Sequence, residues 1–175
     1  MPSKAFAIGF IKFHSFILVA QAFQEKNTDE ILPPSNVTAY LGRYNLSNAA
    51  EEPGSVSSSV SEIFIHPDWN SQATSFDADI AVVILNQTIE YSKFIQPVCL
   101  PSLSYAYVTG SGMVVGWGES KFSGVNFDDH ELTPMEIEIK AVNTSYCHFK
   151  VLELAPYSSH RTFCGGFLNE SKGPC

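Results

Sequence analysis

Short runs of β-forming residues, separated by turn residues, recur throughout this chain of 175 residues. Strands are predicted over 37–44, 56–65 and 135–142, and apolar residues alternate with polar ones in the first and last of these. A continuous apolar run predicts a further strand over 80–85, buried on both sides, and an apolar run between glycines predicts another over 113–117. Short strands bounded by turn signals are typical of an all-β sandwich or barrel.

A single segment departs from this β pattern. Residues 143–152 are the only stretch that predicts a short helix. Asn143 or Thr144 would cap its N-terminus, because their side-chain oxygens can accept a hydrogen bond from a backbone N–H of the first turn. We therefore expect one helix in an otherwise all-β chain.

Composition limits the classes of partner and the compartment. A hydrophobic content of 45% in this length is enough for one globular domain with a core. The net charge of −8 argues against nucleic acid or an anionic membrane surface as a partner. Four cysteines and several Asn-x-Ser/Thr acceptors point to a secreted, extracellular glycoprotein with a disulfide bond. The acceptor asparagines are Asn36, Asn45, Asn86, Asn143 and Asn169.

The first 22 residues have the outline of a secretory signal peptide. Lys4 supplies a small positive region, a mostly apolar stretch follows it, and Ala20-Gln21-Ala22 is a small-x-small cleavage pattern. Lys12 and His14 interrupt the apolar run, which disfavours a transmembrane helix.

Several segments carry a more specific signal. They are DADIAVV at 77–83, QPVCLP at 96–101, VVGWG at 114–118 and TFCGG at 162–166. In this order and spacing they resemble the chymotrypsin/trypsin family of serine endopeptidases. The resemblance implies two antiparallel β-barrels with the active cleft between them. It covers residues 23–175, the later part of the first barrel and the earlier part of the second. We expect an incomplete double β-barrel, a partial trypsin-like domain whose open sheets leave strand edges unpaired.

The same resemblance gives residues 15–22 a second interpretation. Residues 23–26, Phe-Gln-Glu-Lys, resemble the family sequence that follows its catalytic His-Cys pair. On that alignment 15–22 is a barrel strand, and Gln21 and Ala22 occupy the His-Cys positions. The alternatives for residues 1–22 are therefore a signal-like leader or a degenerate N-terminal part of the barrel. Both remove the catalytic histidine.

The resemblance assigns the triad aspartate to Asp79. A triad aspartate accepts a hydrogen bond from the imidazole of the general base and stabilises the imidazolium. The family's Gly-Asp-Ser-Gly-Gly run, which carries the nucleophile, would begin almost directly after Cys175, where the given sequence stops. No other serine has that glycine-rich context, Ser158 included, and the histidines are expected at the surface: His14, His66, His130, His148 and His160.

Other positions follow from the same comparison. Gly173 falls at the base of the primary specificity pocket, where it offers no charge to hold a basic residue. Cys147 and Cys164 match a family disulfide. Cys175 is expected to pair with a cysteine beyond the sequence, and Cys99 resembles the position that joins an upstream regulatory chain. We expect no metal and no cofactor.

Two functions are consistent with these residues. The first is a partial trypsin-like serine endopeptidase domain, a fragment that is inactive as written because base and nucleophile are missing. The alternative is a secreted, non-catalytic serine protease homologue that binds protein or peptide substrates, or protease inhibitors, in an extracellular proteolytic cascade. The incomplete barrels favour the first.

Overall fold

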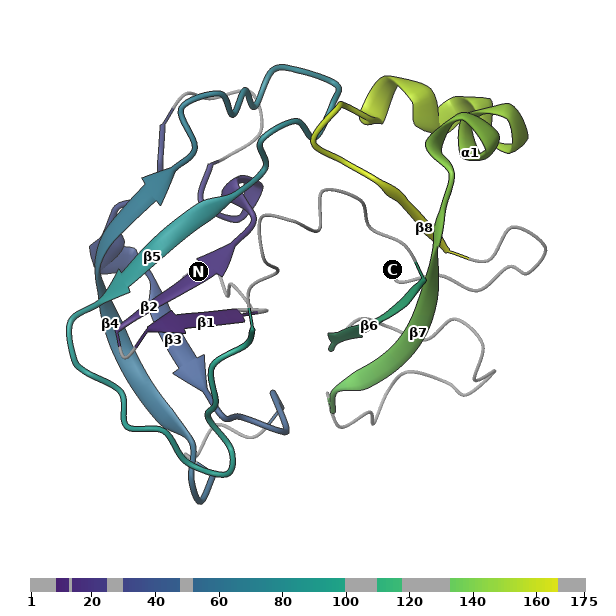
Figure 1. Ribbon diagram of the computed structural model, residues 1–175. Helices are drawn as coiled ribbons and strands as arrows, with labels where there is room; N and C mark the ends of the chain where they lie inside the picture. Colours follow the sequence, from purple (N-terminus) through teal and green to yellow (C-terminus); the bar gives the residue numbers. More distant parts are fainter. Residues whose placement is uncertain are drawn as a thin grey trace.

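The strands of the N-terminal half form one curled antiparallel sheet (Figure 1). The computed structural model describes residues 9–12, 14–24, 30–47, 52–99, 110–117 and 133–166. The spatial order is β1-β2-β5-β4-β3, and every neighbouring pair is antiparallel. The strands are β1 (Gly9–Lys12), β2 (Ser15–Leu18), β3 (Thr38–Leu41), β4 (Val56–Ile65) and β5 (Ala81–Leu85).

Strand β4 lets this sheet curl because it pairs with a different neighbour along each half. Its first residues pair with β3, from Val56 opposite Leu41 to Ser59 opposite Thr38. Its later residues pair with β5, and the register shifts between Val60 and Glu62. Such a bulge bends a strand and increases its twist. The Ser61 hydroxyl donates to the carbonyl of Ile84 (3.1 Å) at this point, which anchors the bulge to β5.

The core lies on the concave side of this sheet. Alternation along the strands sends every second side chain inward, so Ala81, Val83 and Leu85 of β5 are all buried. Burying one large apolar side chain contributes about 1.5–3 kcal/mol, so this cluster supplies most of the driving force for folding. The buried cluster comprises Phe16, Leu18, Ala20, Phe23, Val37, Ala39, Leu41, Val60, Ala81, Val83, Leu85, Ile89 and Ile95.

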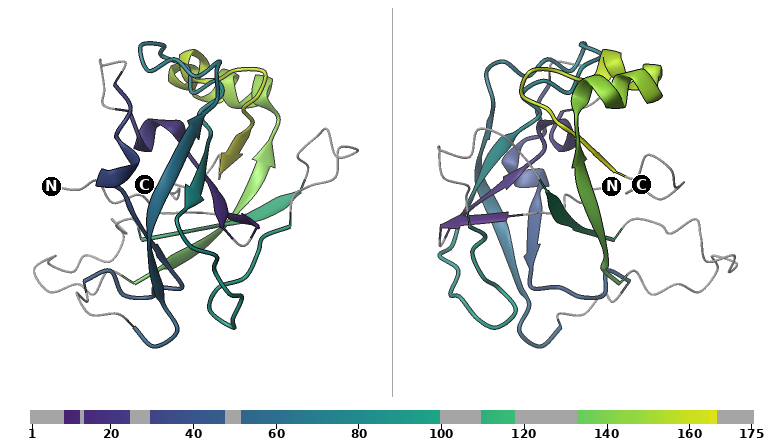
Figure 2. Two further views of the ribbon diagram at one scale, coloured as in Figure 1. Left: turned by 90° about the vertical axis from the view of Figure 1, so that its left-hand side faces the viewer. Right: turned by 45° about the vertical axis from the view of Figure 1, so that its right-hand side comes forward.

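The second sheet has the strand order β6-β7-β8. Its strands are β6 (Ser111–Gly116), β7 (Met135–Val142) and β8 (Cys164–Gly166). Between β7 and β8 lie α1 (Thr144–Lys150) and the 3₁₀ segment η4 (Leu152–Tyr157). Figure 2 shows that this helical part sits at one end of the sheet, close to the loop that precedes β5.

The predicted elements recur with adjusted ends. The strands over 56–65 and 135–142 and the helix are confirmed, and Asn143 is the cap: its side chain accepts from the N–H of Tyr146 (3.1 Å). The strand expected over 37–44 stops at Leu41, because Gly42 turns the chain with φ +67°. The prediction that 80–85 is buried on both sides is wrong. Val82 and Ile84 are only half-buried, since the part of the chain that the structure describes does not fully cover the outer face of β5.

In the described part of the chain, no helix combines the length and the apolarity that crossing a membrane requires.

Gly54 provides a test of the surface contact between its own turn and Phe94. Its φ is +90°, and a Cβ at this position would clash with the ring carbons Cδ2 and Cε2 of Phe94. Gly110 has almost the same φ, +93°, but a Cβ added there would meet no atom within 4 Å. We expect Gly54→Ala to destabilise the protein by about 2–4 kcal/mol, from left-handed strain plus displacement of the ring.

Gly110→Ala is the matched control, because it introduces the strain alone. It should lower the free energy of unfolding, measured by urea denaturation, by about 1–2 kcal/mol. Equal losses in the two variants would show that Phe94 does not pack on Gly54.

Candidate active site

Asp79 lies at the start of β5, in a turn with unusual backbone geometry. Ala78, directly before it, is buried and has φ +56°, which is uncommon for any residue with a Cβ. The N–H of Ile80 donates to the carbonyl of Ala78 (2.7 Å), so the backbone folds tightly around Asp79. Strained backbone of this kind persists only where the surrounding structure fixes it, and it is frequent at functional sites.

The pairing of β2 with β5 brings a second segment to the same place. Because the two strands run antiparallel, with Leu18 opposite Ala81, the end of β2 meets the start of β5. The 3₁₀ segment η1 (Ala20–Ala22) follows directly. Its Gln21 N–H donates to Asp79 Oδ1 (2.9 Å). Asp79 is thus held on one side by its own turn and on the other by η1.

Two opposing effects set the protonation of Asp79. Partial burial raises the pKa of the carboxyl group, because the ionised form loses solvation. The backbone N–H groups of Gln21 and Ala20 lower the pKa, since they stabilise the carboxylate. Burial is the larger effect, so the pKa of Asp79 lies above its usual range. A neighbouring imidazolium would stabilise the carboxylate and lower the pKa of Asp79. The groups that donate to Asp79 are instead the backbone amides of Gln21 and Ala20.

The structure makes residues 15–22 a strand followed by a helical turn rather than one strand. Phe16, Leu18, Ala20 and Phe23 all contribute to the buried core. The chain must turn at η1 for its amides to reach Asp79, which explains why the strand ends at Leu18. On the alignment that places 15–22 in the barrel, Gln21 is the residue at the position of the base.

One hydroxyl–imidazole pair was not expected from the sequence. His148 Nε2 lies 2.9 Å from Ser158 Oγ, and that hydroxyl also donates to the carbonyl of Leu154 (3.0 Å). A hydroxyl has one proton, so with that proton on Leu154 the imidazole acts as donor and Ser158 is not activated as a nucleophile. The pair joins α1 to the end of η4. Apart from the short separation of His148 and Ser158 in the sequence, no sequence pattern indicates this pair.

The other histidines are placed as follows. His14 is exposed, and His66 Nδ1 accepts the N–H of Asp68 (3.1 Å) within its own turn. His160 Nε2 accepts from Arg161 Nε (3.3 Å). His130 lies outside the described residues.

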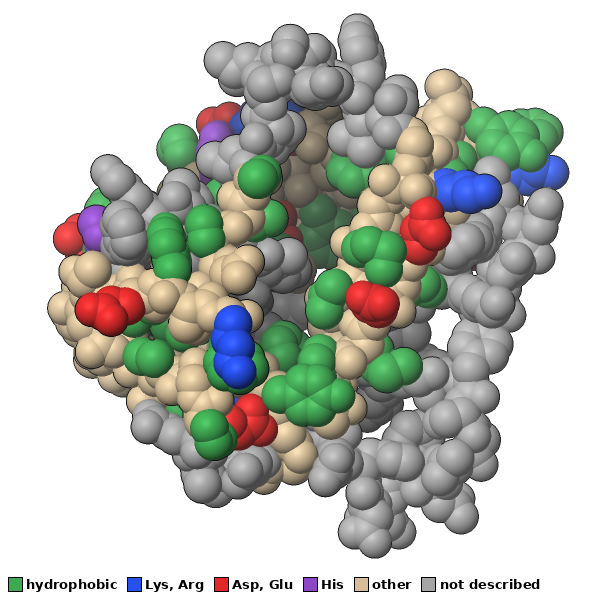
Figure 3. All heavy atoms as spheres, turned by 60° about the horizontal axis from the view of Figure 1, so that its bottom comes forward, with side chains coloured by type: hydrophobic (Ala, Val, Ile, Leu, Met, Phe, Trp, Pro, Cys, Tyr) green, Lys and Arg blue, Asp and Glu red, His purple; other side chains and the backbone are tan. Residues whose placement is uncertain are grey.

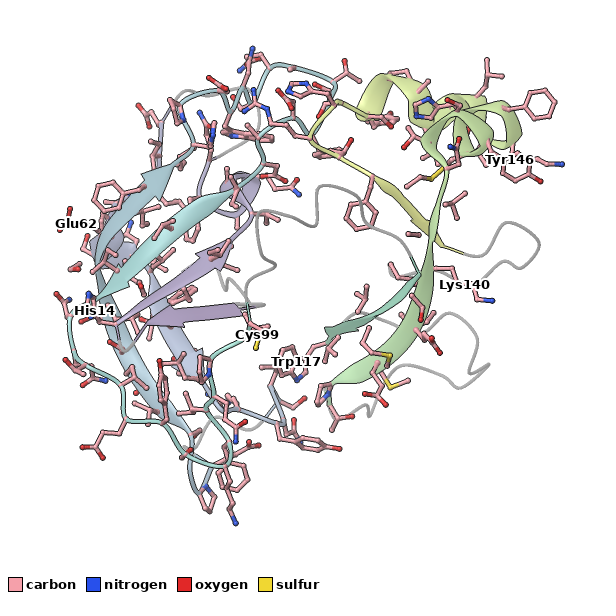
Figure 4. All side chains as sticks on the ribbon, viewed as in Figure 1. His14, Glu62, Cys99, Trp117, Lys140 and Tyr146 are labelled. Atoms are coloured by element: carbon pink, nitrogen blue, oxygen red, sulfur yellow. A yellow bond between two sulfur atoms is a disulfide. The ribbon has the colours of Figure 1, made fainter. Side chains whose placement is uncertain are left out.

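The predicted disulfide is present between Cys147 and Cys164, with a Cα–Cα distance of 6.5 Å. It ties α1 to β8. Cys99 is an exposed free thiol in the part of the chain that the structure describes, and Figure 4 shows it on the side of the first sheet that faces the second. Gly173 and Cys175 lie outside the described residues, so their assignments remain predictions.

The acceptor asparagines occupy varied positions. Asn36, Asn86 and Asn143 are exposed, whereas Asn45 is half-buried. Asn169 lies outside the described residues. Glycosylation at each of them remains a prediction.

Glu52 has a local structural role. Its two carboxylate oxygens accept the N–H groups of Tyr44 (2.6 Å) and Asn45 (2.8 Å). These two bonds lower the pKa of Glu52. Within the described ranges, no cluster of three or more acidic, histidine or cysteine side chains could hold a metal ion.

The left-handed Ala78 can be tested by comparison with Ala81, which is also buried but belongs to β5. In both variants, replacing alanine by glycine lowers the free energy of unfolding in two ways. The lost burial of the methyl group costs about 0.8 kcal/mol, and the greater entropy of the unfolded chain costs about 0.4–1 kcal/mol. Ala78→Gly also relieves about 1–2 kcal/mol of backbone strain, so its free energy of unfolding should equal that of the wild type within roughly 0.5 kcal/mol. Ala81→Gly should lose about 1–2 kcal/mol. Equal losses, measured by denaturant unfolding, would contradict the strained turn.

The raised pKa of Asp79 predicts how stability depends on pH. A carboxyl group with a raised folded pKa binds its proton more tightly in the folded state, so ionisation lowers stability as the pH rises above the ordinary value of 3.8. We expect Asp79→Asn to be more stable than the wild type at pH 7, and the difference to vanish towards pH 3, in thermal melts across this range.

Glu52→Gln is the control of opposite sign. The lowered pKa of Glu52 contributes stability above its ordinary value of 4.5, and this is lost as the pH falls. The Glu52→Gln protein should therefore be less stable than the wild type at pH 7 and equal to it in acid. An Asp79→Asn variant that is destabilised at pH 7 would show that the amide bonds outweigh burial.

Comparison with known proteins gives a consistent result. The model of the Trypsin family matches residues 26–175. "Serine protease gd" of Drosophila melanogaster is 34% identical over 187 residues, which cover 98% of this chain and 35% of that protein. "Suppressor of tumorigenicity 14 protein homolog" of Bos taurus is 31% identical over 140 residues, 79% of this chain and 15% of the relative. "Serine protease filzig" of Drosophila melanogaster is 22% identical over 147 residues, 81% of this chain and 8% of the relative.

The chain thus spans 35% or less of the length of each of these relatives. The family match covers most of the chain, and the sheets carry the antiparallel order expected of a trypsin-like double β-barrel. The chain belongs to the trypsin family of serine proteases.

Proposed function

We propose that this trypsin-like domain does not cleave peptide bonds by the family's triad, because Gln21 stands where the general base is required. The supporting observation is the bond from the Gln21 N–H to Asp79 Oδ1 (2.9 Å). It brings η1 against the aspartate proposed for the triad, which supports the proposal that Gln21 occupies the base position. A glutamine side chain cannot take up a proton at neutral pH, so it cannot activate a serine.

This argument rests on an internal position of the chain. The first 22 residues are accordingly proposed to include the last strand before the base, because Phe16 and Leu18 are buried against β5. A leader that is cleaved after Ala22 would remove that strand from the sheet. On this proposal the trypsin-like domain begins before residue 23.

The role proposed for such a domain is binding. Trypsin-like proteases act on protein substrates and are met by protein inhibitors, and a domain without its base can still present the loops that surround the cleft. Figure 3, in which the bottom of the molecule as drawn in Figure 1 is turned forward, shows apolar side chains on both sides of a hollow. Of the two functions the sequence allowed, the substitution at Gln21 favours the non-catalytic homologue.

Secretion is part of the same proposal. The Cys147–Cys164 disulfide persists in oxidising compartments, and exposed acceptor asparagines fit a secreted glycoprotein. Attachment to an upstream regulatory chain would use the exposed thiol of Cys99. No cofactor is needed for binding through these loops.

The test uses the longest natural product of the transcript, so that it does not depend on the limits of the given sequence. We expect no turnover of fluorogenic peptides with Arg, Phe or Ala at the scissile position, and no labelling by a fluorophosphonate. Trypsin is the positive control. Turnover that a serine-directed inhibitor blocks, and that Asp79→Ala abolishes, would overturn the proposal.

Gln21→His is the matched gain-of-function variant. If the natural product carries the nucleophile run, this change should raise turnover by orders of magnitude, because losing the base costs about a millionfold in such triads. If it carries none, the variant should stay inactive while both proteins bind immobilised protease inhibitors. Inactivity combined with no binding to any protease inhibitor or substrate protein would exclude the binding role.

A further inference from the structure

We propose that Arg161 is a positioning residue that fastens the second sheet to the Asp77–Asp79 turn and so keeps Asp79 against η1. Arg161 lies in the loop between η4 and β8. Its Nη2 is 2.6 Å from Asp68 Oδ2, and its Nε is 3.3 Å from Asp77 Oδ1. One guanidinium from the second half of the chain thus holds two carboxylates from the first half.

These bonds matter because the two sheets meet through loops. The most extensive contacts between described elements lie within each sheet, between β4 and the 3₁₀ segment η2 (Pro34–Asn36), and between α1 and η4. Near Arg161, the N–H of Phe76 donates to the carbonyl of Tyr157 (3.1 Å), and the two rings stack with centroids 6.0 Å apart. At the opposite end, Trp117 Nε1 donates to the carbonyl of Tyr44 (2.8 Å), and Figure 4 shows Trp117 between the sheets.

Asp77 depends on Arg161 for its charge balance. Its Oδ1 is buried and makes no hydrogen bond, although the guanidinium lies at ion-pair distance. A buried carboxylate oxygen without a hydrogen bond is costly unless a positive charge is close, and Arg161 supplies that charge. Arg161 also holds the pKa of Asp68 below its usual range. Removing the guanidinium would leave these two carboxylates without their shared cation.

The link from Arg161 to Asp79 is short and stiff on both sides. Cys164, three residues after Arg161, is joined to α1 by the disulfide with Cys147. Asp77 is separated from Asp79 only by Ala78, whose left-handed backbone leaves little freedom. A shift of Asp77 therefore moves the Asp79 carboxylate relative to the Gln21 amide. The contact between Gln21 and Asp79 is thus set in part by a residue of the loop that leads into β8 of the other sheet.

Hydrogen exchange of the Gln21 amide reports on this arrangement directly, because that N–H is bonded to Asp79. We expect Arg161→Gln to speed exchange at Gln21 several-fold while exchange at Val83, buried in β5, is unchanged. Arg161→Lys should fall between the wild type and Arg161→Gln, because an ammonium group cannot bridge two carboxylates as a guanidinium does. Lys93→Gln, which removes a cation from the loop that follows β5, is the control and should change neither amide.

An equal acceleration at Gln21 and Val83 would mean that Arg161 only stabilises the whole fold, and would overturn the proposal, as would unchanged exchange at Gln21. A second measurement needs no variant. Raising the salt concentration on the wild-type protein should weaken the partly exposed ion pairs and speed exchange at Gln21 selectively. A Gln21 amide that is insensitive to salt would contradict the proposal even if Arg161→Gln failed to fold.

Discussion

The antiparallel pairing of β2 with β5 is the constraint on which the geometry of this domain depends. It places Leu18 opposite Ala81, so that the end of β2 meets the start of β5 at one end of the sheet. Both strands also send their buried side chains into the same core. A slip of one residue would turn those side chains outward, so burial fixes the register. The contact between Gln21 and Asp79 is therefore a consequence of core packing.

Local sequence pattern predicted most of the elements, and burial patterns explain why. Strand β7 alternates apolar and polar residues, and its ends were predicted correctly. Strand β3 ends early because Gly42 adopts a positive φ, and no alternation pattern carries that information. The outer face of β5 is half-open although its sequence is apolar throughout. A continuous apolar run therefore indicated a strand, but it did not say how much of each face is covered.

The sequence predicted residues of the candidate site only where they belong to a recognisable motif. Asp79 stands out through the residues that surround it, and the disulfide between Cys147 and Cys164 follows from a family pattern that the structure bears out. Arg161 has no such signature, since its partners Asp68 and Asp77 are distant in sequence and become neighbours only when the two halves meet. Interactions between loops depend on the tertiary fold. They leave no periodic pattern of apolar and polar residues from which a single sequence could predict them.

Asp77 and Asp79 show how two nearly adjacent carboxylates can depend on different partners. Asp77 faces a guanidinium, whereas Asp79 is stabilised by backbone amides that exist whatever side chain Gln21 carries. Amide donors hold the carboxylate in place, but they do not offset its burial, and its pKa stays raised. A cationic imidazole at position 21 would offset that burial. On the proposed assignment of position 21 to the general base, the turn lacks the positive partner that would offset the burial of Asp79, while the left-handed backbone of Ala78 is retained.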